Sequence, residues 1–140
     1  MERNDVTIVG GGPSGSVCAK ILAEKGLNVV LLEKFGRDRH KPCAGGISTP
    51  AYELVPIPGN LIERKIVSGL IVSASNNSVI VGSPAEPGFT VYRSSYDKWL
   101  MDEAEKSGAT VENDAKVSII DIKEDEVIVK AEIEGKPKDI

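Results

Sequence analysis

A glycine-rich run near the N-terminus has the residue types and spacing to bind phosphate. Residues 10–15 read GGGPSG and fit the pattern G-x-G-x-x-G. In such a loop the first glycine permits a tight turn, the second lets backbone approach a pyrophosphate, and the third allows close packing of helix on strand. These glycines are Gly10, Gly12 and Gly15. A helix beginning here adds unbonded N–H groups and partial positive charge, so the loop predicts a dinucleotide site.

The segments around this loop predict the strand, helix and strand that such a site needs. Residues 5–9 (DVTIV) are typical of a buried parallel strand, and Pro13 suits the first turn of a helix over 14–25. A second apolar run follows at 28–33. This order predicts a parallel βαβ unit with a right-handed crossover. The helix should bury one apolar stripe: Val17, Cys18, Ile21 and Leu22.

An acidic residue ends the second apolar run. Glu33 stands where a carboxylate can accept hydrogen bonds from the hydroxyls of an adenosine ribose, and its charge repels a 2′-phosphate, which disfavours NADP. Ser14 inside the loop and Lys34 directly after the acid belong to the same predicted binding site. The glycines and the acid alone leave FAD and NAD both open.

The rest of the chain predicts a hairpin and a further helix. Residues 66–73 and 78–81 flank a polar turn, which is typical of a β-hairpin. Ser94 followed by Asp97 resembles a capping box and predicts a helix that runs to about Ser107. Its inner face should hold Tyr96, Trp99, Leu100 and Ala104.

Three further segments complete the predicted fold. Residues 109–111 should form a third parallel strand, and residues 117–122 and 126–133 an antiparallel pair. We therefore predict an α/β fold, namely a Rossmann-type dinucleotide-binding domain with an antiparallel β-meander. The final residues, 135–140, follow a strand, which is an unusual end for a complete doubly wound domain.

Composition limits the functions open to the chain. Its 140 residues suit one domain, and 41% apolar with 27% charged residues is ordinary for a soluble globular protein. A net charge of −4 without clustered lysine and arginine gives nucleic-acid binding little support. Cys18 and Cys43 form no CxxC pair and His40 is the one histidine, so no metal site is predicted and a reducing, cytosolic compartment fits. Without a run of about 18 apolar residues, any contact with membrane lipid is expected to be peripheral.

One loop resembles a known family. Residues 41–48 read KPCAGGIS and resemble the Lys-Pro-Cys-Gly-Gly segment of the geranylgeranyl reductase family, which includes archaeal digeranylgeranylglycerophospholipid reductases and chlorophyll-pathway enzymes. The similarity continues through 62–67, 92–100 and 104–109. It covers nearly the whole chain but only the front part of such an enzyme. The resemblance implies FAD, held in a fold similar to para-hydroxybenzoate hydroxylase, and reduction of isolated C=C bonds in geranylgeranyl chains.

The resemblance also implies roles for single residues of the nucleotide site. Gly15 and its neighbours would touch the pyrophosphate of FAD and Glu33 the ribose. Arg93 would contact the cofactor from the start of its helix. Val117 matches a position where backbone meets the adenine end.

The Lys-Pro-Cys loop is expected near the flavin. By resemblance, Cys43, Ala44 and Gly46 would lie along the FAD, with Cys43 as the candidate catalytic residue for redox or proton delivery. A plain role as a small loop residue stays open for this cysteine. Ala44 departs from the glycine that the family usually has.

The expected function follows from this resemblance. We expect an FAD-dependent reductase acting on an isoprenoid lipid, with NAD(P)H or ferredoxin left open as the electron donor. Residues 1–140 would be the N-terminal portion of the FAD-binding domain, inactive by itself, with the C-terminal remainder and the substrate domain outside this chain. An FAD-dependent aromatic hydroxylase and a non-catalytic dinucleotide-binding module remain the alternatives.

Overall fold

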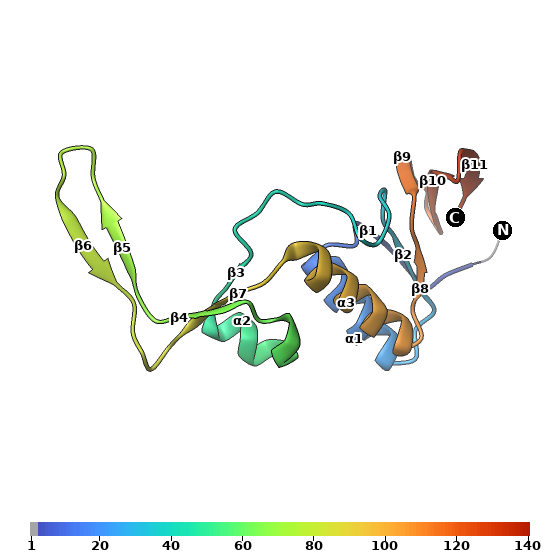
Figure 1. Cartoon of the computed structure of the whole chain (residues 1–140). Coiled ribbons are helices and arrows are strands. Elements are labelled where there is room, and N and C mark those ends of the chain that lie inside the picture. The colour runs from blue at the N-terminus through green and yellow to red at the C-terminus, as the bar shows by residue number, and fades with distance from the viewer. Residues whose placement is uncertain (1–2) are drawn as a thin grey trace. The chain divides into compact units, whose positions relative to one another are not determined.

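The computed structural model describes residues 3–140, which divide into two compact units. The first unit combines the chain up to His40 with Asp97–Ile140, and the second is Lys41–Tyr96. Figure 1 labels the helices and strands of both units.

A three-stranded parallel sheet forms the centre of the first unit. Its strands are β1 (Val6–Val9), β2 (Val29–Leu32) and β8 (Thr110–Glu112), in the order β1-β2-β8. All four residues of β2 are buried, as expected for an apolar strand covered on both faces. The predicted βαβ unit and the third parallel strand are therefore confirmed.

The two faces of β2 belong to different layers of the core. Val29 and Leu31 pack with residues of helix α1 (Pro13–Glu24) and helix α3 (Arg93–Lys106). Val30 and Leu32 pack with buried residues of the antiparallel strands. This alternation follows from the two-residue period of a strand, and it yields a helix layer, a parallel sheet and an antiparallel sheet.

Helix α1 buries a different face from the predicted stripe. Its buried residues are Ser16, Ala19 and Ala23, whereas Cys18 and Ile21 are exposed. Small side chains on this face let the helix axis come close to the sheet. The prediction that the larger apolar residues form the buried face was therefore wrong. Val17 and Leu22 are half-buried.

Helix α3 carries most of its predicted inner face into the core. Its buried apolar residues are Tyr96, Leu100, Met101 and Ala104, while Trp99 is half-buried. The helix starts at Arg93, so Ser94 lies inside the helix and not at the cap that the capping-box pattern predicted.

The antiparallel sheet has one strand more than predicted. Strands β9 (Ala115–Ile122), β10 (Val127–Ile133) and β11 (Lys136–Asp139) pair in the order β11-β10-β9. The connection from β10 to β11 has positive φ at Glu134 and Gly135, as a tight type I′ hairpin turn requires. The predicted meander is therefore confirmed and extends to the end of the chain.

The second unit contains short strands and a hairpin. Strands β3 (Gly46–Ile47), β7 (Gly88–Thr90) and β4 (Arg64–Ile66) form an antiparallel sheet in the order β3-β7-β4. Helix α2 (Thr49–Leu54) and the 3-10 turn η1 (Gly59–Leu61) lie between β3 and β4 in the chain.

The predicted hairpin of the second unit is confirmed. Strands β5 (Gly69–Val72) and β6 (Ser78–Val81) pair with each other in a two-stranded sheet of their own, with every residue exposed. Within residues 3–140, no helix has the length and apolar character that a bilayer span requires.

Candidate functional site

One pocket gathers most of the predicted nucleotide-binding residues. It has a volume of about 600 Å³ and lies where the glycine loop, the end of β2 and the start of β9 meet in the first unit. The carboxyl ends of parallel strands are the usual place for ligands in such folds. Its lining includes these predicted residues: Gly10, Gly12, Ser14, Gly15, Glu33, Lys34 and Val117.

The three motif glycines differ in what surrounds them. Gly10 has a φ of +109°, which side chains other than glycine rarely adopt. A Cβ on Gly15 would collide with the carbonyl oxygen of Gly10, so this glycine permits the close approach of α1. A Cβ on Gly12 would have Arg39 Nη2 as its nearest neighbour, at 3.8 Å. The protein alone therefore does not explain Gly12, whereas an approaching ligand would.

Gly11, which the motif leaves unspecified, is equally constrained. It is buried, and a Cβ there would lie 2.8 Å from Met101 Sδ and 3.0 Å from Glu33 Cβ. Its N–H donates a 2.8 Å hydrogen bond to Glu33 Oε2. The loop and the acid at the end of β2 are thus directly joined.

The start of α1 provides donors beside the pocket. Gly12 is the N-cap residue and makes no side-chain capping bond. The N–H of Ser16 bonds the Gly12 carbonyl at 3.0 Å, so the N–H groups of Ser14 and Gly15 precede the first intrahelical bond. This end of the helix can therefore receive an anion.

Glu33 is held in a fixed orientation. Its side chain is buried, with Oε2 accepting from Gly11 and Oε1 accepting from the Phe35 N–H at 3.1 Å. Each carboxylate oxygen has two lone pairs, so the acid keeps acceptor capacity toward the pocket.

Arg39 also lines the pocket, although no sequence pattern predicted it as a site residue. Its Nη2 lies 3.1 Å from Asp97 Oδ2 and 3.6 Å from Glu33 Oε2. Asp97 is fully buried on α3, 58 residues away along the chain. The position in a basic loop was the one available signal, because no local pattern predicts so distant an ion pair.

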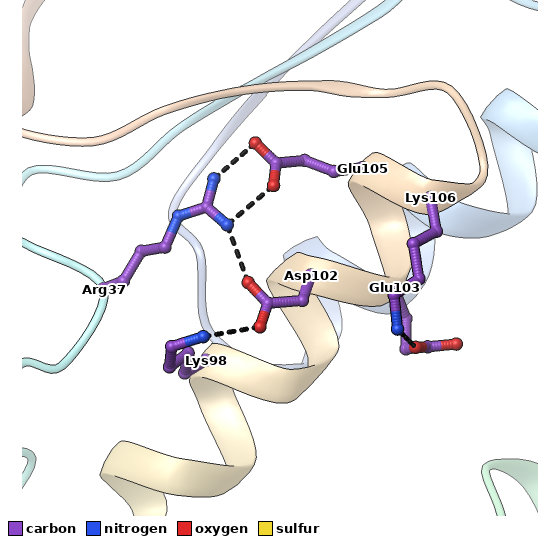
Figure 2. A network of polar contacts seen from close by, with 6 residues as sticks. All are labelled: Arg37, Lys98, Asp102, Glu103, Glu105 and Lys106. Carbon is purple, nitrogen blue, oxygen red and sulfur yellow. Dashed lines mark hydrogen bonds and ion pairs between the residues drawn. The ribbon is translucent and has the colours of Figure 1, made fainter.

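A second arginine ties the same loop to α3 (Figure 2). Arg37 Nη1 donates to Asp102 Oδ1 at 2.7 Å and to Glu105 Oε2 at 2.6 Å, and Lys98 donates to Asp102 Oδ2 at 2.6 Å. The hydrogen bonds that Arg37 donates to Glu105 are the main cause that raises the pKa of Arg37. Partial burial raises the pKa of Asp102, but the bonds from Lys98 and Arg37 outweigh it and lower that pKa overall.

The other predicted cofactor residues lie in the second unit. Cys43 is exposed, and its Sγ accepts the N–H of Gly45 at 3.4 Å. Gly45 has a φ of +67° and lies so close to the Val91 carbonyl that a side chain would clash. The Lys-Pro-Cys loop is therefore fixed at this glycine, which the sequence analysis did not single out.

Three more predicted residues belong to the second unit. Ala44 is exposed, and Gly46 begins strand β3 with open space around its Cβ position. Arg93 is half-buried and is the first residue of α3. The structure thus divides the predicted set between the pocket of the first unit and the second unit.

Comparison with known proteins places these features in a family. The family model described as an FAD binding domain matches residues 3–139. Geranylgeranyl diphosphate reductase of Rhodobacter capsulatus is 41% identical over 109 residues, which is 76% of this chain and 27% of that protein. Digeranylgeranylglycerophospholipid reductase 1 of Methanosphaera stadtmanae is 33% identical over 131 residues, which is 90% of this chain and 32% of that protein.

A solved structure shows the same fold. The crystal structure of a geranylgeranyl bacteriochlorophyll reductase-like protein from Thermoplasma acidophilum superimposes with a TM-score of 0.87 at 27% identity. The match covers 99% of this chain and 37% of that protein. The chain thus spans about a third of the length of the relatives that it matches.

Proposed function

This chain belongs to the FAD-binding domain family, and we propose that it is the N-terminal portion of a flavin-dependent reductase acting on isoprenoid lipids. The observation that carries the proposal is the pocket at the glycine loop. Gly12 is open there and Gly15 packs tightly, as a diphosphate cradle requires. FAD is the cofactor of this family, and the residues present fit its nucleotide portion.

The chain's residues divide the work of holding the cofactor. We propose that Gly10, Gly12, Ser14 and Gly15 receive the diphosphate through backbone N–H groups. Glu33 would accept from the ribose hydroxyls, with Lys34 beside it. Val117, which lines the same pocket from β9, would contact the adenine end.

The second unit would serve the flavin end. We propose that Cys43, Ala44 and Gly46 lie along the cofactor and that Arg93 contacts it, with Cys43 as the candidate for a chemical role. When bound, flavin supplies two-electron redox chemistry, and the protein supplies binding and orientation. Reduction of an isolated C=C bond adds one hydride and one proton across that bond.

Two observations support a longer enzyme with a lipid substrate. The relatives named as geranylgeranyl and digeranylgeranyl reductases share 41% and 33% identity with this chain. In the β5–β6 hairpin the apolar residues are mostly more than half exposed, Ile80 at 73% and Leu70 at 63%. Monomeric proteins rarely leave such contiguous apolar surface uncovered. We propose that further chain covers the hairpin and completes the substrate site, and that contact with the membrane is peripheral.

The reductase assignment is tested by exchanging the matched region of the Rhodobacter capsulatus reductase, 27% of that protein, for the corresponding residues of this chain. With dithionite as electron source, geranylgeranyl diphosphate should gain the mass of two hydrogens for each bond reduced. The 140-residue chain alone, the matched control, should show no turnover. A chimera that binds FAD but hydroxylates an aromatic substrate with NAD(P)H and oxygen would contradict the reductase assignment. A folded chimera without bound flavin would contradict the cofactor site itself.

A further inference from the structure

We propose that Arg39 is a diphosphate-binding residue of the nucleotide pocket and that Asp97 positions it. The proposal deepens the proposed function and rests on it, because the diphosphate belongs to the FAD expected in this pocket. Neither residue is part of the glycine motif.

The guanidinium of Arg39 lies beside the glycine loop. Arg39 lines the pocket, and its Nη2 would lie 3.8 Å from a Cβ on Gly12. Gly12 is the glycine that the protein's own packing leaves unexplained and that a phosphate approach explains. A cation at that distance stands within reach of an anion received by the loop.

Within residues 3–140, the Arg39 side chain is held on one side and keeps donors free on the other. Among the described residues, the ion pairs of Arg39 with Asp97 and with Glu33 are both made through Nη2. A guanidinium has five N–H donors, so Nη1 remains as a donor group. The Nε atom is buried without a hydrogen-bond partner among the described residues, so the surrounding protein leaves this cation incompletely satisfied. An arginine placed only for structure would normally have its buried donors paired.

A diphosphate in this pocket needs a positive charge to offset Glu33. Glu33 is buried at the pocket wall, and its carboxylate would repel a diphosphate. Arg39 lies between that carboxylate and the buried carboxylate of Asp97, with 11% of its side chain exposed. Because Asp97 holds the guanidinium, the positive charge stays beside the loop when the pocket is empty. Arginine suits this role because its planar fork matches phosphate geometry.

The test compares ADP with adenosine as probes of the purified 140-residue chain, using isothermal titration calorimetry. Arg39→Met should weaken ADP binding about 10- to 100-fold, the usual effect of losing a hydrogen bond between charged groups. Adenosine lacks phosphate, so its affinity should stay unchanged. Arg37→Met is the matched control, because it removes another arginine of the same loop that pairs with α3 but does not line the pocket. It should leave both affinities unchanged.

The outcomes separate this proposal from the proposed function. If the wild-type chain binds neither ADP nor FAD, the proposed function fails. If it binds ADP and Arg39→Met binds it equally well, the role of Arg39 is overturned while the cofactor site stands. Equal losses for ADP and adenosine would also overturn it, since they indicate a purely structural role. Should Arg39→Met not fold, Arg39→Lys decides. Lysine keeps a positive charge beside Asp97 but lacks the planar guanidinium, so the affinity for ADP should fall several-fold while the affinity for adenosine stays the same. An unchanged affinity for ADP would overturn the proposal.

Discussion

Gly12→Ala should remove most of the FAD affinity and leave the fold intact. Gly12 has φ −78° and ψ 178°, an extended conformation open to any residue, and the added methyl would meet its nearest neighbour at 3.8 Å. Alanine is a poorer N-cap than glycine, but it also restricts the unfolded chain. The two effects oppose each other, so the free energy of unfolding should change by less than about 1 kcal/mol.

Cofactor affinity should respond much more strongly. The methyl group would occupy the space through which a phosphate reaches the N–H groups at the start of α1. A hydrogen bond to a charged group contributes about 1.5–3 kcal/mol, so loss of one corresponds to roughly 10- to 150-fold weaker binding. A bulkier residue such as leucine should abolish binding.

The assay pairs a flavin absorbance titration with thermal unfolding of the same samples. Gly59→Ala is the matched control, because a Cβ there likewise meets no clash but lies outside the pocket. It should bind FAD like the wild type. Unchanged FAD affinity in Gly12→Ala would refute the assignment of the phosphate cradle.

Three further results are expected. Gly15→Ala should lower the free energy of unfolding by several kcal/mol even without ligand, since its Cβ would collide with the Gly10 carbonyl; thermal stability equal to wild type would contradict the tight packing of α1. Arg37→Met should cost about 1 kcal/mol at neutral pH, because its partners are partly exposed. The pKa of Asp102 is lowered in the folded protein, so the stability contributed by its pairing with Arg37 is fully present above the ordinary pKa of 3.8 and is lost as the pH falls through the lower folded pKa. A stability difference between wild type and Arg37→Met that persists in acid, measured by urea unfolding, would argue against the network. Leu31→Ala should cost about 2–5 kcal/mol because Leu31 is fully buried, and a smaller loss in urea unfolding would show a looser core.

The local patterns of the sequence predicted the nucleotide-binding elements well. The run DVTIV, the glycine loop and the acid at position 33 lie within one βαβ unit, so each is set by its neighbours in the chain. The third parallel strand and the β5–β6 hairpin were also readable, because apolar runs bounded by turn residues depend little on distant contacts.

What the sequence could not supply depended on distant contacts or on close packing. The ion pair of Arg39 with Asp97 joins residues 58 positions apart. The buried face of α1 consists of small residues, whose burial reflects how closely the helix approaches the sheet. Strand β11 reads KPKD, a sequence with low strand propensity that becomes a strand by pairing with β10.

The roles of the second unit remain predictions. The sequence resemblance assigned Cys43, Ala44, Gly46 and Arg93 to the cofactor. They belong to the second unit, and the nucleotide pocket is lined by residues of the first unit. The placement of these residues along the flavin belongs to the proposal and is open to the same binding experiments.

Titration of the purified 140-residue chain with FAD and, separately, with NAD tests the central claim most directly. The readouts are the flavin absorbance spectrum and the shift of the thermal unfolding midpoint. Selective binding and stabilisation by FAD is the result that the pocket and the family membership predict. Selective binding of NAD, or no stabilisation of a folded chain by either ligand, would contradict the assignment of the glycine-loop pocket to FAD.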